Sequence, residues 1–318
     1  MIQHRSEETP RCSTRLLSPF RYPGGKTWLV PYVCQWLCEI EPKPTLFVEP
    51  FAGGGIVGLN VAHRDLINHV LLVELDEDVA AVWETILKGD AKGLADRIAG
   101  FDMSRASVQA ALSRRPGTVQ ERAFQTILRN RVNRAGILAS GAGMLRNGEG
   151  GRGISSRWYP ETLRRRIVEI ERMRDSITFL ACDGIEVLAQ FAGGVSGARV
   201  REASIGAAIA ASSLPRSLLQ ERAAFFIDPP YSFSGKRAGV RLYRYHQLDH
   251  EQLFRLAAGL SGEFVMTCSN DNRARDLARV HNFDSEEVPM RSSHHVDMAE
   301  LLIGRDLDWL RRMRRRLA

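Results

Sequence analysis

The stretch PTLFVEPFAGGGIVGLNVAHRD, residues 44–65, decides the fold. It begins with a short apolar segment, Thr45–Val48, passes through a glycine turn and resumes with helical spacing near Ile56. The next stretch, HVLLVELDEDVAAVWETIL, repeats this order with a strand over Val70–Leu75, an acidic turn and a helix from about Asp78. Strand, helix, strand, helix is the opening of a doubly wound parallel sheet, so we expect an α/β fold.

Three further stretches have the apolar character of buried parallel strands: ITFLACD at 177–183, AAFFIDPPY at 223–231 and GEFVMTCSN at 262–270. EQLFRLAAGL, before the last of them, has helical spacing. The chain between the second and third predicted strands is instead mostly helical and Arg-rich, with a glycine-laden interruption, which predicts an inserted helical segment carrying exposed loops. The Ala-, Ser- and Gly-rich segment 193–220 predicts a loop or lid with some helix.

Composition sets limits on the class of protein. The 318 residues are 44% hydrophobic, so a sizeable core is expected, and no run of about 18 apolar residues or signal-peptide core occurs. We therefore expect a cytoplasmic protein without a membrane segment. Five scattered cysteines predict reduced thiols, and no second pair accompanies Cys34 and Cys38 to complete a metal site.

The net charge of +7 favours a polyanionic partner. Between Arg129 and Arg174 there are 11 Arg and 4 Glu, interleaved with Gly, Asn, Trp158 and Tyr159, as a nucleic-acid-binding segment would require. The chain ends in RRMRRRLA, for which we expect a solvated tail.

The segment SPFRYPGGKTWLVPYV, residues 18–33, contains a glycine-lysine pair of the kind found in phosphate-binding loops. That loop needs a glycine five places before the Gly-Lys pair, where this chain has Phe20. The preceding residues are polar and interrupted by Pro10, so no strand leads into the loop. The pattern argues against a nucleoside triphosphate.

Gly53, Gly55 and Gly58 satisfy G-x-G-x-x-G between a strand and a helix, and Glu74 ends the next strand, where an acid can hold ribose hydroxyls. The pattern alone would suit NAD. Glu49 and Pro50, however, stand between the strand and the glycines and give a wider turn with a carboxylate able to reach an ammonium group. This favours S-adenosylmethionine as the cofactor, because nothing else in the chain suggests hydride transfer.

Asp228, Pro229, Pro230 and Tyr231 follow the buried segment AAFFI, at the end of a strand where parallel sheets place their ligands. A carboxylate and a backbone carbonyl can accept the two N–H bonds of an exocyclic amine and free its lone pair for in-line attack on a sulfonium methyl. Asp228 and the Pro229 carbonyl suit these two roles, since the prolines fix the backbone. Tyr231 offers a ring on which a flipped-out base can stack. No metal is required.

FRYPGGK, FVEPFAGGG and DPPY in this order resemble the DNA adenine methylase family, the alpha group of N6-adenine DNA methyltransferases, over about Pro19 to Leu310. NRVNRAGIL, SRWYPETL, RLYRYHQLDHEQLF and HHVDMAELLIG add to the resemblance. It implies a Rossmann-like S-adenosylmethionine-dependent sheet in 18–84 and 176–318 and an inserted helical DNA-recognition domain in 85–175. We expect residues 1–17 to form a flexible N-terminal arm. MTCSND stands where the family has a tyrosine-containing stretch, so no second base-stacking residue is identified.

The resemblance implies a role for each matching residue. The catalytic residues would be Asp228, Pro229, Pro230 and Tyr231. The S-adenosylmethionine contacts would be Tyr22, Lys26, Glu49, Pro50, Phe51, Gly53, Gly55, Glu74, Asp183, Gly184 and Asp228. The DNA contacts would be Arg129, Arg131, Asn133, Arg134, Asn147 and Arg152.

The expected partner is double-stranded DNA, with a cognate restriction endonuclease if the chain is half of a restriction-modification pair, and the expected state is a monomer or weak dimer. Two other functions share these motifs. One is methylation of a different exocyclic amine, on cytosine N4 or on RNA, because the same acceptors serve all of them. The other is a DNA-binding protein that has lost catalysis, which would predict damage at Glu49, Gly53, Glu74 or Asp228, and all four are intact.

Overall fold

A computed structural model describes residues 13–21, 24–139, 142–145, 148, 151–193, 216–230, 248–291 and 297–317. Tyr22, Asn147, Tyr231 and most of the 193–220 segment lie outside these residues. Seven strands form one sheet in the order β3-β2-β1-β4-β5-β7-β6. Their bounds are β1 Leu46–Glu49, β2 His69–Val73, β3 Ile177–Leu180, β4 Ala223–Ile227, β5 Phe264–Ser269, β6 Asp284–Arg291 and β7 Asp297–Gly304.

The first five strands are parallel, and β7 runs antiparallel to both β5 and β6. The chain order reverses between β1 and β4, which pair directly, so the crevice at their carboxyl ends is the topological switch point of the sheet. This is the Rossmann-like α/β sheet expected for a methyltransferase.

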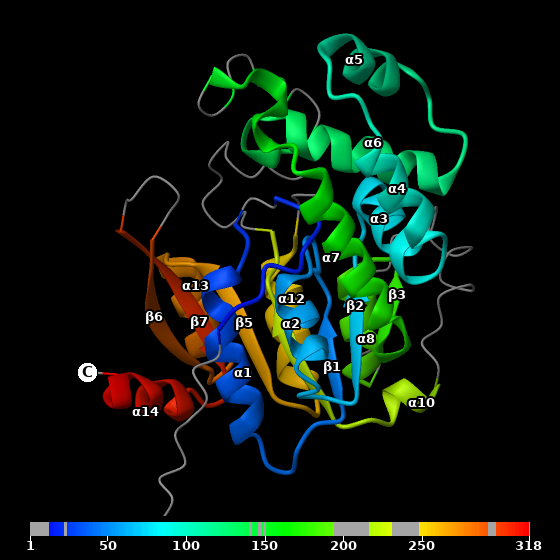
Figure 1. Ribbon diagram of the computed structural model, residues 1–318. Coiled ribbons are helices and arrows are strands. Elements are labelled where there is room, and N and C mark those ends of the chain that lie inside the picture. Colours follow the sequence, from blue (N-terminus) through cyan, green and yellow to red (C-terminus); the bar gives the residue numbers. More distant parts are fainter. Residues whose placement is uncertain are drawn as a thin grey trace, which may run out of the picture.

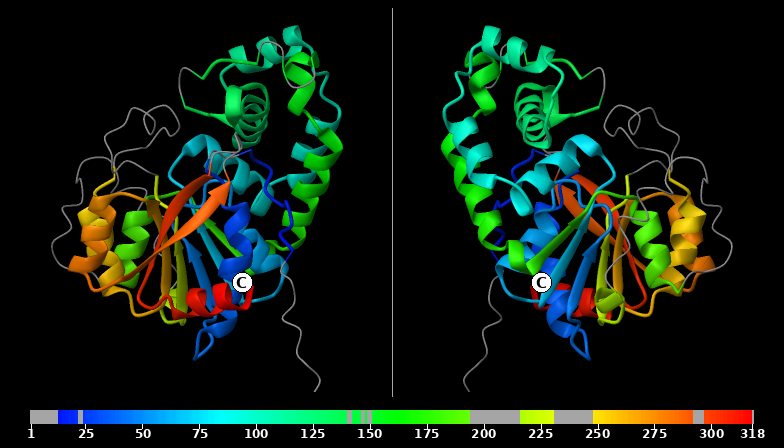
Figure 2. Two further views of the ribbon diagram at one scale, coloured as in Figure 1. Left: turned by 90° about the vertical axis from the view of Figure 1, so that its left-hand side faces the viewer. Right: turned by 90° about the vertical axis from the view of Figure 1, so that its right-hand side faces the viewer.

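Helices cover both faces of the sheet (Figures 1 and 2). Around the sheet the bounds are α1 Val30–Glu39, α2 Ile56–His63, α3 Glu77–Leu87, α8 Gly184–Phe191, α10 Arg216–Leu219, α12 His250–Gly259, α13 Asn272–Val280 and α14 Asp308–Leu317. Side chains on one face of the sheet, such as Phe47, pack with α1, α2 and α3. Side chains on the other face, such as Leu46 and Val48, pack with α8, α12 and α13. Continuous apolar strands buried on both faces explain why the sequence signal for the parallel core was strong.

The segment between β2 and β3 continues from α3 into α4 Ala91–Ala99, α5 Arg105–Ser113, α6 Val119–Val132 and α7 Pro160–Arg172. Short 3-10 turns occur at Thr27–Leu29, Arg134–Gly136, Gly153–Arg157 and Arg174–Ser176. Figure 1 shows α5 and α6 beyond the carboxyl ends of the parallel strands. The hydrophobic cluster on the face of the sheet that packs with α1, α2 and α3 continues into α4, α6 and α7, so these helices share the core of the sheet.

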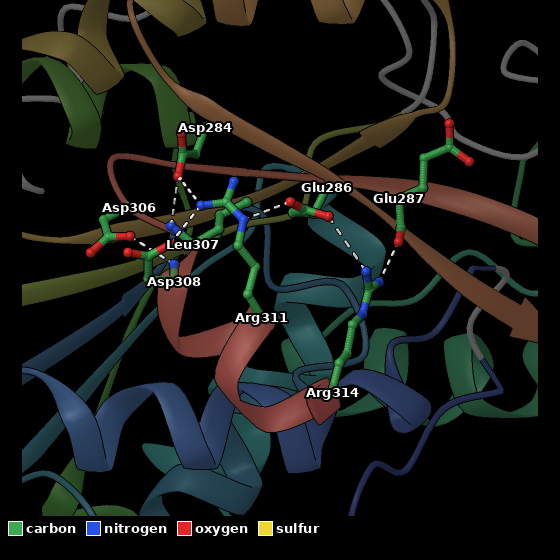
Figure 3. Close-up of polar contacts among 8 residues, drawn as sticks. All are labelled: Asp284, Glu286, Glu287, Asp306, Leu307, Asp308, Arg311 and Arg314. Carbon is green, nitrogen blue, oxygen red and sulfur yellow. Dashed lines mark hydrogen bonds and ion pairs between the residues drawn. The ribbon is translucent and has the colours of Figure 1, made fainter. Parts of the chain in front are cut away.

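The basic C-terminus is a helix, and the expectation of a solvated tail was wrong. Figure 3 shows the side chain of Arg311 bonded to Asp284, Glu286 and Asp308, while Arg314 bonds to Glu286 and to the carbonyl oxygen of Glu287. The opposite face of the helix buries Trp309 and Leu310 in the core. The acids of β6 therefore neutralise the arginines and dock α14 against the sheet.

Candidate active site

A cavity of about 500 Å³ opens at the carboxyl ends of the parallel strands, within the usual size range of small-molecule sites. The glycine turn after β1, the acidic turn after β2, the start of α8 and Asp228-Pro229-Pro230 line it on the side of the sheet. Arg131, Tyr159 and Arg166 line it on the side of the helical segment. The topology thus gathers into one site most of the residues that the sequence singled out.

The glycine turn has a backbone that side chains rarely adopt. Gly53 and Gly55 have φ angles of +48° and +59°, and Gly55 is the N-cap of α2. A Cβ at Gly55 would lie 2.9 Å from the ring of Trp83, whose indole N–H donates to the Gly53 carbonyl oxygen at 3.0 Å. Trp83 is fully buried and so fixes the turn from beneath, a role that sequence analysis missed.

Two carboxylates shape the turn from either side. The Gly58 N–H donates to Glu49 Oε2 at 2.8 Å, and the Gly53 N–H donates to Glu74 Oε2 at the same distance. Burial raises the pKa of Glu49 to about 8, and the nearby charge of Asp228 adds to this rise. Burial likewise raises the pKa of Glu74 to about 7. Both acids are held in place by backbone hydrogen bonds and face the cavity.

Asp183 caps α8, its Oδ1 accepting from the Ile185 N–H at 2.9 Å, and burial raises its pKa. A Cβ at Gly184 would meet the Pro50 carbonyl oxygen at 2.0 Å, so the two loops can approach this closely only with glycine at that position. Pro50 and Phe51 line the same part of the cavity. The carboxyl end of β3 is thereby packed against the glycine turn.

Lys26 lies beneath the cavity with a side chain only 3% exposed. Its Nζ is 3.0 Å from Asp228 Oδ1 and 3.6 Å from Glu300 Oε1, and it donates to the Gly24 carbonyl oxygen at 2.8 Å. The Thr267 hydroxyl also donates to Asp228 Oδ1, at 2.5 Å. The ammonium and the hydroxyl together fix the orientation of the carboxylate.

Thr267 and Glu300 had not been identified from the sequence. Thr267 is an inward-facing residue of β5 and Glu300 belongs to β7, so only the strand order brings them to Asp228. Among the described residues, no helix is long and apolar enough to cross a membrane, and no three His, Cys, Asp or Glu side chains are grouped to hold a metal ion.

The glycine-lysine loop, the glycine turn and the acid after β2 correspond to one known family. Residues 22–108 match the family model of D12 class N6 adenine-specific DNA methyltransferases. This confirms, over that part of the chain, the resemblance drawn from the motifs to a family of adenine-specific DNA methyltransferases. Asp228-Pro229-Pro230 lies outside the matched residues. Comparison with curated proteins gives no match.

The arginine-rich segment differs from the open basic surface that the sequence suggested. Arg129 pairs with Asp78 at 3.2 Å, Arg131 is 4% exposed and donates to the Pro19 carbonyl oxygen at 2.6 Å, and Asn133 is buried and donates to Ile137. Arg134 and Arg152 are exposed. An Arg-rich helix that crosses a core must satisfy its polar groups internally, which composition alone does not reveal.

Buried side chains of this segment hold the N-terminal residues 13–21 against the cavity. The side chain of Asn130 accepts from the Arg21 N–H at 2.8 Å and donates to the Arg21 and Gly136 carbonyl oxygens. Arg166 donates to the Ser18 carbonyl oxygen at 2.9 Å. Leu17 is buried, so residues 13–21 are packed along the helices rather than extending as a free arm.

Proposed function

We propose that this chain transfers a methyl group from S-adenosylmethionine to the N6 amine of an adenine flipped out of duplex DNA. The observation that carries the proposal is the placement of Asp228 beside the glycine turn, across the switch point from Glu49 and in one cavity with it. A base held at Asp228 and a cofactor held at the glycine turn would therefore be neighbours.

The residues around the glycine turn suit the cofactor. The left-handed backbone of Gly53 and Gly55 leaves room for close approach, and the carboxylates of Glu49 and Glu74 offer acceptors for an ammonium group and for ribose hydroxyls. Asp183 and Gly184, with Pro50 and Phe51, would hold the adenine ring of the cofactor. When bound there, S-adenosylmethionine supplies a methyl group activated by a sulfonium.

Asp228 and the Pro229 carbonyl would accept the two N–H bonds of the target amine. The amine lone pair would then be free to take the methyl group that bound S-adenosylmethionine supplies, with the sulfur as leaving group, and the amine would lose one proton to solvent. Lys26 and Thr267 both contact Asp228 Oδ1, so they would orient the carboxylate that holds the base. Tyr231, the stacking residue expected from the sequence, stays a prediction.

Duplex DNA would lie across the cavity mouth, against the helical segment. The exposed guanidinium groups of Arg134 and Arg152 are the groups best placed to meet phosphates or base edges. Arg131 could meet a phosphate only inside the cavity, because that is where its buried side chain is accessible. The proposed DNA-recognition domain, residues 85–175, thus divides into a buried half and an exposed half.

Substitution of Asp228 tests the proposal. Asp228→Ala should lower the transfer of labelled methyl groups to unmethylated duplex DNA at least about a hundredfold, since it removes an acceptor for the reacting amine. The binding of S-adenosylmethionine, measured by calorimetry, should weaken less than about tenfold. Asp175→Ala is the matched control, because that carboxylate is fully exposed outside the cavity. Wild-type transfer rates in Asp228→Ala would refute the assignment.

A further inference from the structure

We propose that Tyr159 is a second stacking surface for the target adenine, on the helical side of the cavity, where Arg166 is available for a phosphate of the same nucleotide. The inference rests on the proposed function and adds a substrate-side subsite that the sequence motifs do not identify. It follows from the exposure of Tyr159, its anchoring, and the placement of charged side chains along the cavity.

Tyr159 is a partly exposed aromatic residue of the cavity wall. Its side chain lines the cavity, yet the residue remains 41% exposed. The other aromatic residues of the described cavity lining, Phe20 and Phe51, come from the N-terminal segment and the glycine turn. Phe20 is buried and packs against Trp83, 6.0 Å between ring centroids. Within that lining, Tyr159 is therefore the aromatic ring on the helical side.

The ring is held rigidly enough to serve as a platform. Trp158, the preceding residue, is buried and packs edge-to-face on Phe101, with centroids 5.9 Å apart. Pro160, the following residue, begins α7. Arg152 donates to the Tyr159 hydroxyl at 3.3 Å, and its guanidinium carbon lies 6.0 Å from the ring centroid. These neighbours fix both the backbone and the hydroxyl end of the side chain.

The acidic side chains and the two arginines of the helical segment line different parts of the cavity. Glu49, Glu74 and Asp183 lie on the side of the sheet, where a cationic cofactor would bind. Arg131 and Arg166 lie on the side of Tyr159, and no carboxylate of the described residues lies within 4 Å of either guanidinium group. The part that contains Tyr159 is therefore suited to an anionic ligand such as a nucleotide phosphate.

The arginines also lack full compensation. Arg131 Nε is buried without a hydrogen-bond partner in the described chain, although Nη2 is bonded to Pro19. Burial, with the positive charges of Arg166 and Arg21, lowers the pKa of Arg131 to about 9. A phosphate at this end would relieve that repulsion. The aromatic ring and the guanidinium groups together match the two parts of a nucleotide.

The experiment compares Tyr159→Ala and Tyr159→Phe with the wild type. Once the methylated adenine has been mapped on duplex DNA, 2-aminopurine at that position reports unstacking by its fluorescence. We expect Tyr159→Ala to lower kcat/KM about 5- to 150-fold, the range for loss of one base–aromatic stack, and to reduce the 2-aminopurine signal. Tyr159→Phe should stay within about threefold, and the affinity for S-adenosylmethionine should change less than twofold in both.

Val119→Ala is the matched control, because Val119 is an exposed apolar residue of the same helical segment that does not line the cavity. Unchanged kcat/KM and fluorescence in Tyr159→Ala would overturn the inference. So would a tenfold weaker affinity for S-adenosylmethionine, which would make Tyr159 a cofactor contact. If the wild type itself transfers no label to adenine, the proposed function has failed rather than the role of Tyr159.

Discussion

Replacing Lys26 with Met removes a buried cation while keeping a side chain of similar length. The Lys26 ammonium lies 3.0 Å and 3.6 Å from the carboxylates of Asp228 and Glu300. At an effective dielectric constant of about 20, each attraction is about 5 kcal/mol before the cost of desolvation. Loss of one partner of a fully buried pair costs about 3–5 kcal/mol. Because the side chain of Asp228 is 22% exposed, we expect the lower value, about 3 kcal/mol.

Urea unfolding followed by circular dichroism at pH 7 measures this loss. With an m-value of about 3 kcal/mol/M, the midpoint should fall by about 1 M. Adding Glu300→Gln to Lys26→Met should recover part of the stability, because the acid left without its cation becomes a neutral amide. Lys43→Met is the control, since Lys43 is exposed, and it should change stability by less than about 0.5 kcal/mol.

A loss below about 1 kcal/mol in Lys26→Met, with no recovery in the double variant, would refute this account of the Lys26 network. The sequence had suggested instead that Lys26 contacts S-adenosylmethionine. A variant with unchanged stability and strongly weakened cofactor binding would support that earlier interpretation.

Three other predictions follow from the contacts of single residues. The stability of the wild type relative to Glu49→Gln, measured by urea titration, should fall by about 1 kcal/mol per pH unit between pH 5 and 8. The reason is that the carboxyl of Glu49 ionises near pH 4.5 in the unfolded chain and only near pH 8 in the folded protein. A stability difference that does not change with pH would contradict the raised pKa. Trp83→Phe should cost about 1 kcal/mol and weaken calorimetric cofactor binding several-fold by releasing the Gly53 carbonyl, and equal affinity would remove Trp83 from a positioning role. Arg311→Ala should lower stability by about 1 kcal/mol in thermal melts without altering the salt dependence of DNA binding. Arg315→Ala, on the same helix, should change neither the stability nor that salt dependence.

The sequence predicted those parts of the fold whose signal is local. The strand before the glycine turn, the helix at Ile56 and the strand at 177 all begin within one residue of their expected positions. These segments combine an apolar strand, turn residues and a helical pattern within about 20 residues. β6 and β7 were not predicted as strands, because β6 is rich in charged residues that make sense only against the arginines of α14.

The residues of the site could likewise be predicted where the signal is local in the sequence, and not where it depends on contacts between distant segments. Glu49, Glu74 and Asp228 could be singled out because each stands at the end of a predicted strand, and parallel strands bring such residues together. Asp183 was named only from the family resemblance. The contacts that Lys26 and Thr267 make with Asp228 could not be predicted, since both residues lie far from it along the chain and meet it only after the sheet has formed. Charge counting likewise could not separate arginines that hold the fold from those on the surface.

The nucleoside that receives the methyl group distinguishes the proposed function from its alternatives. The purified protein would be incubated with labelled S-adenosylmethionine and unmethylated duplex DNA, and the DNA digested to nucleosides and separated. The account predicts label in N6-methyldeoxyadenosine. Label in N4-methyldeoxycytidine, label with RNA alone, or cofactor binding without transfer to any nucleic acid would contradict it.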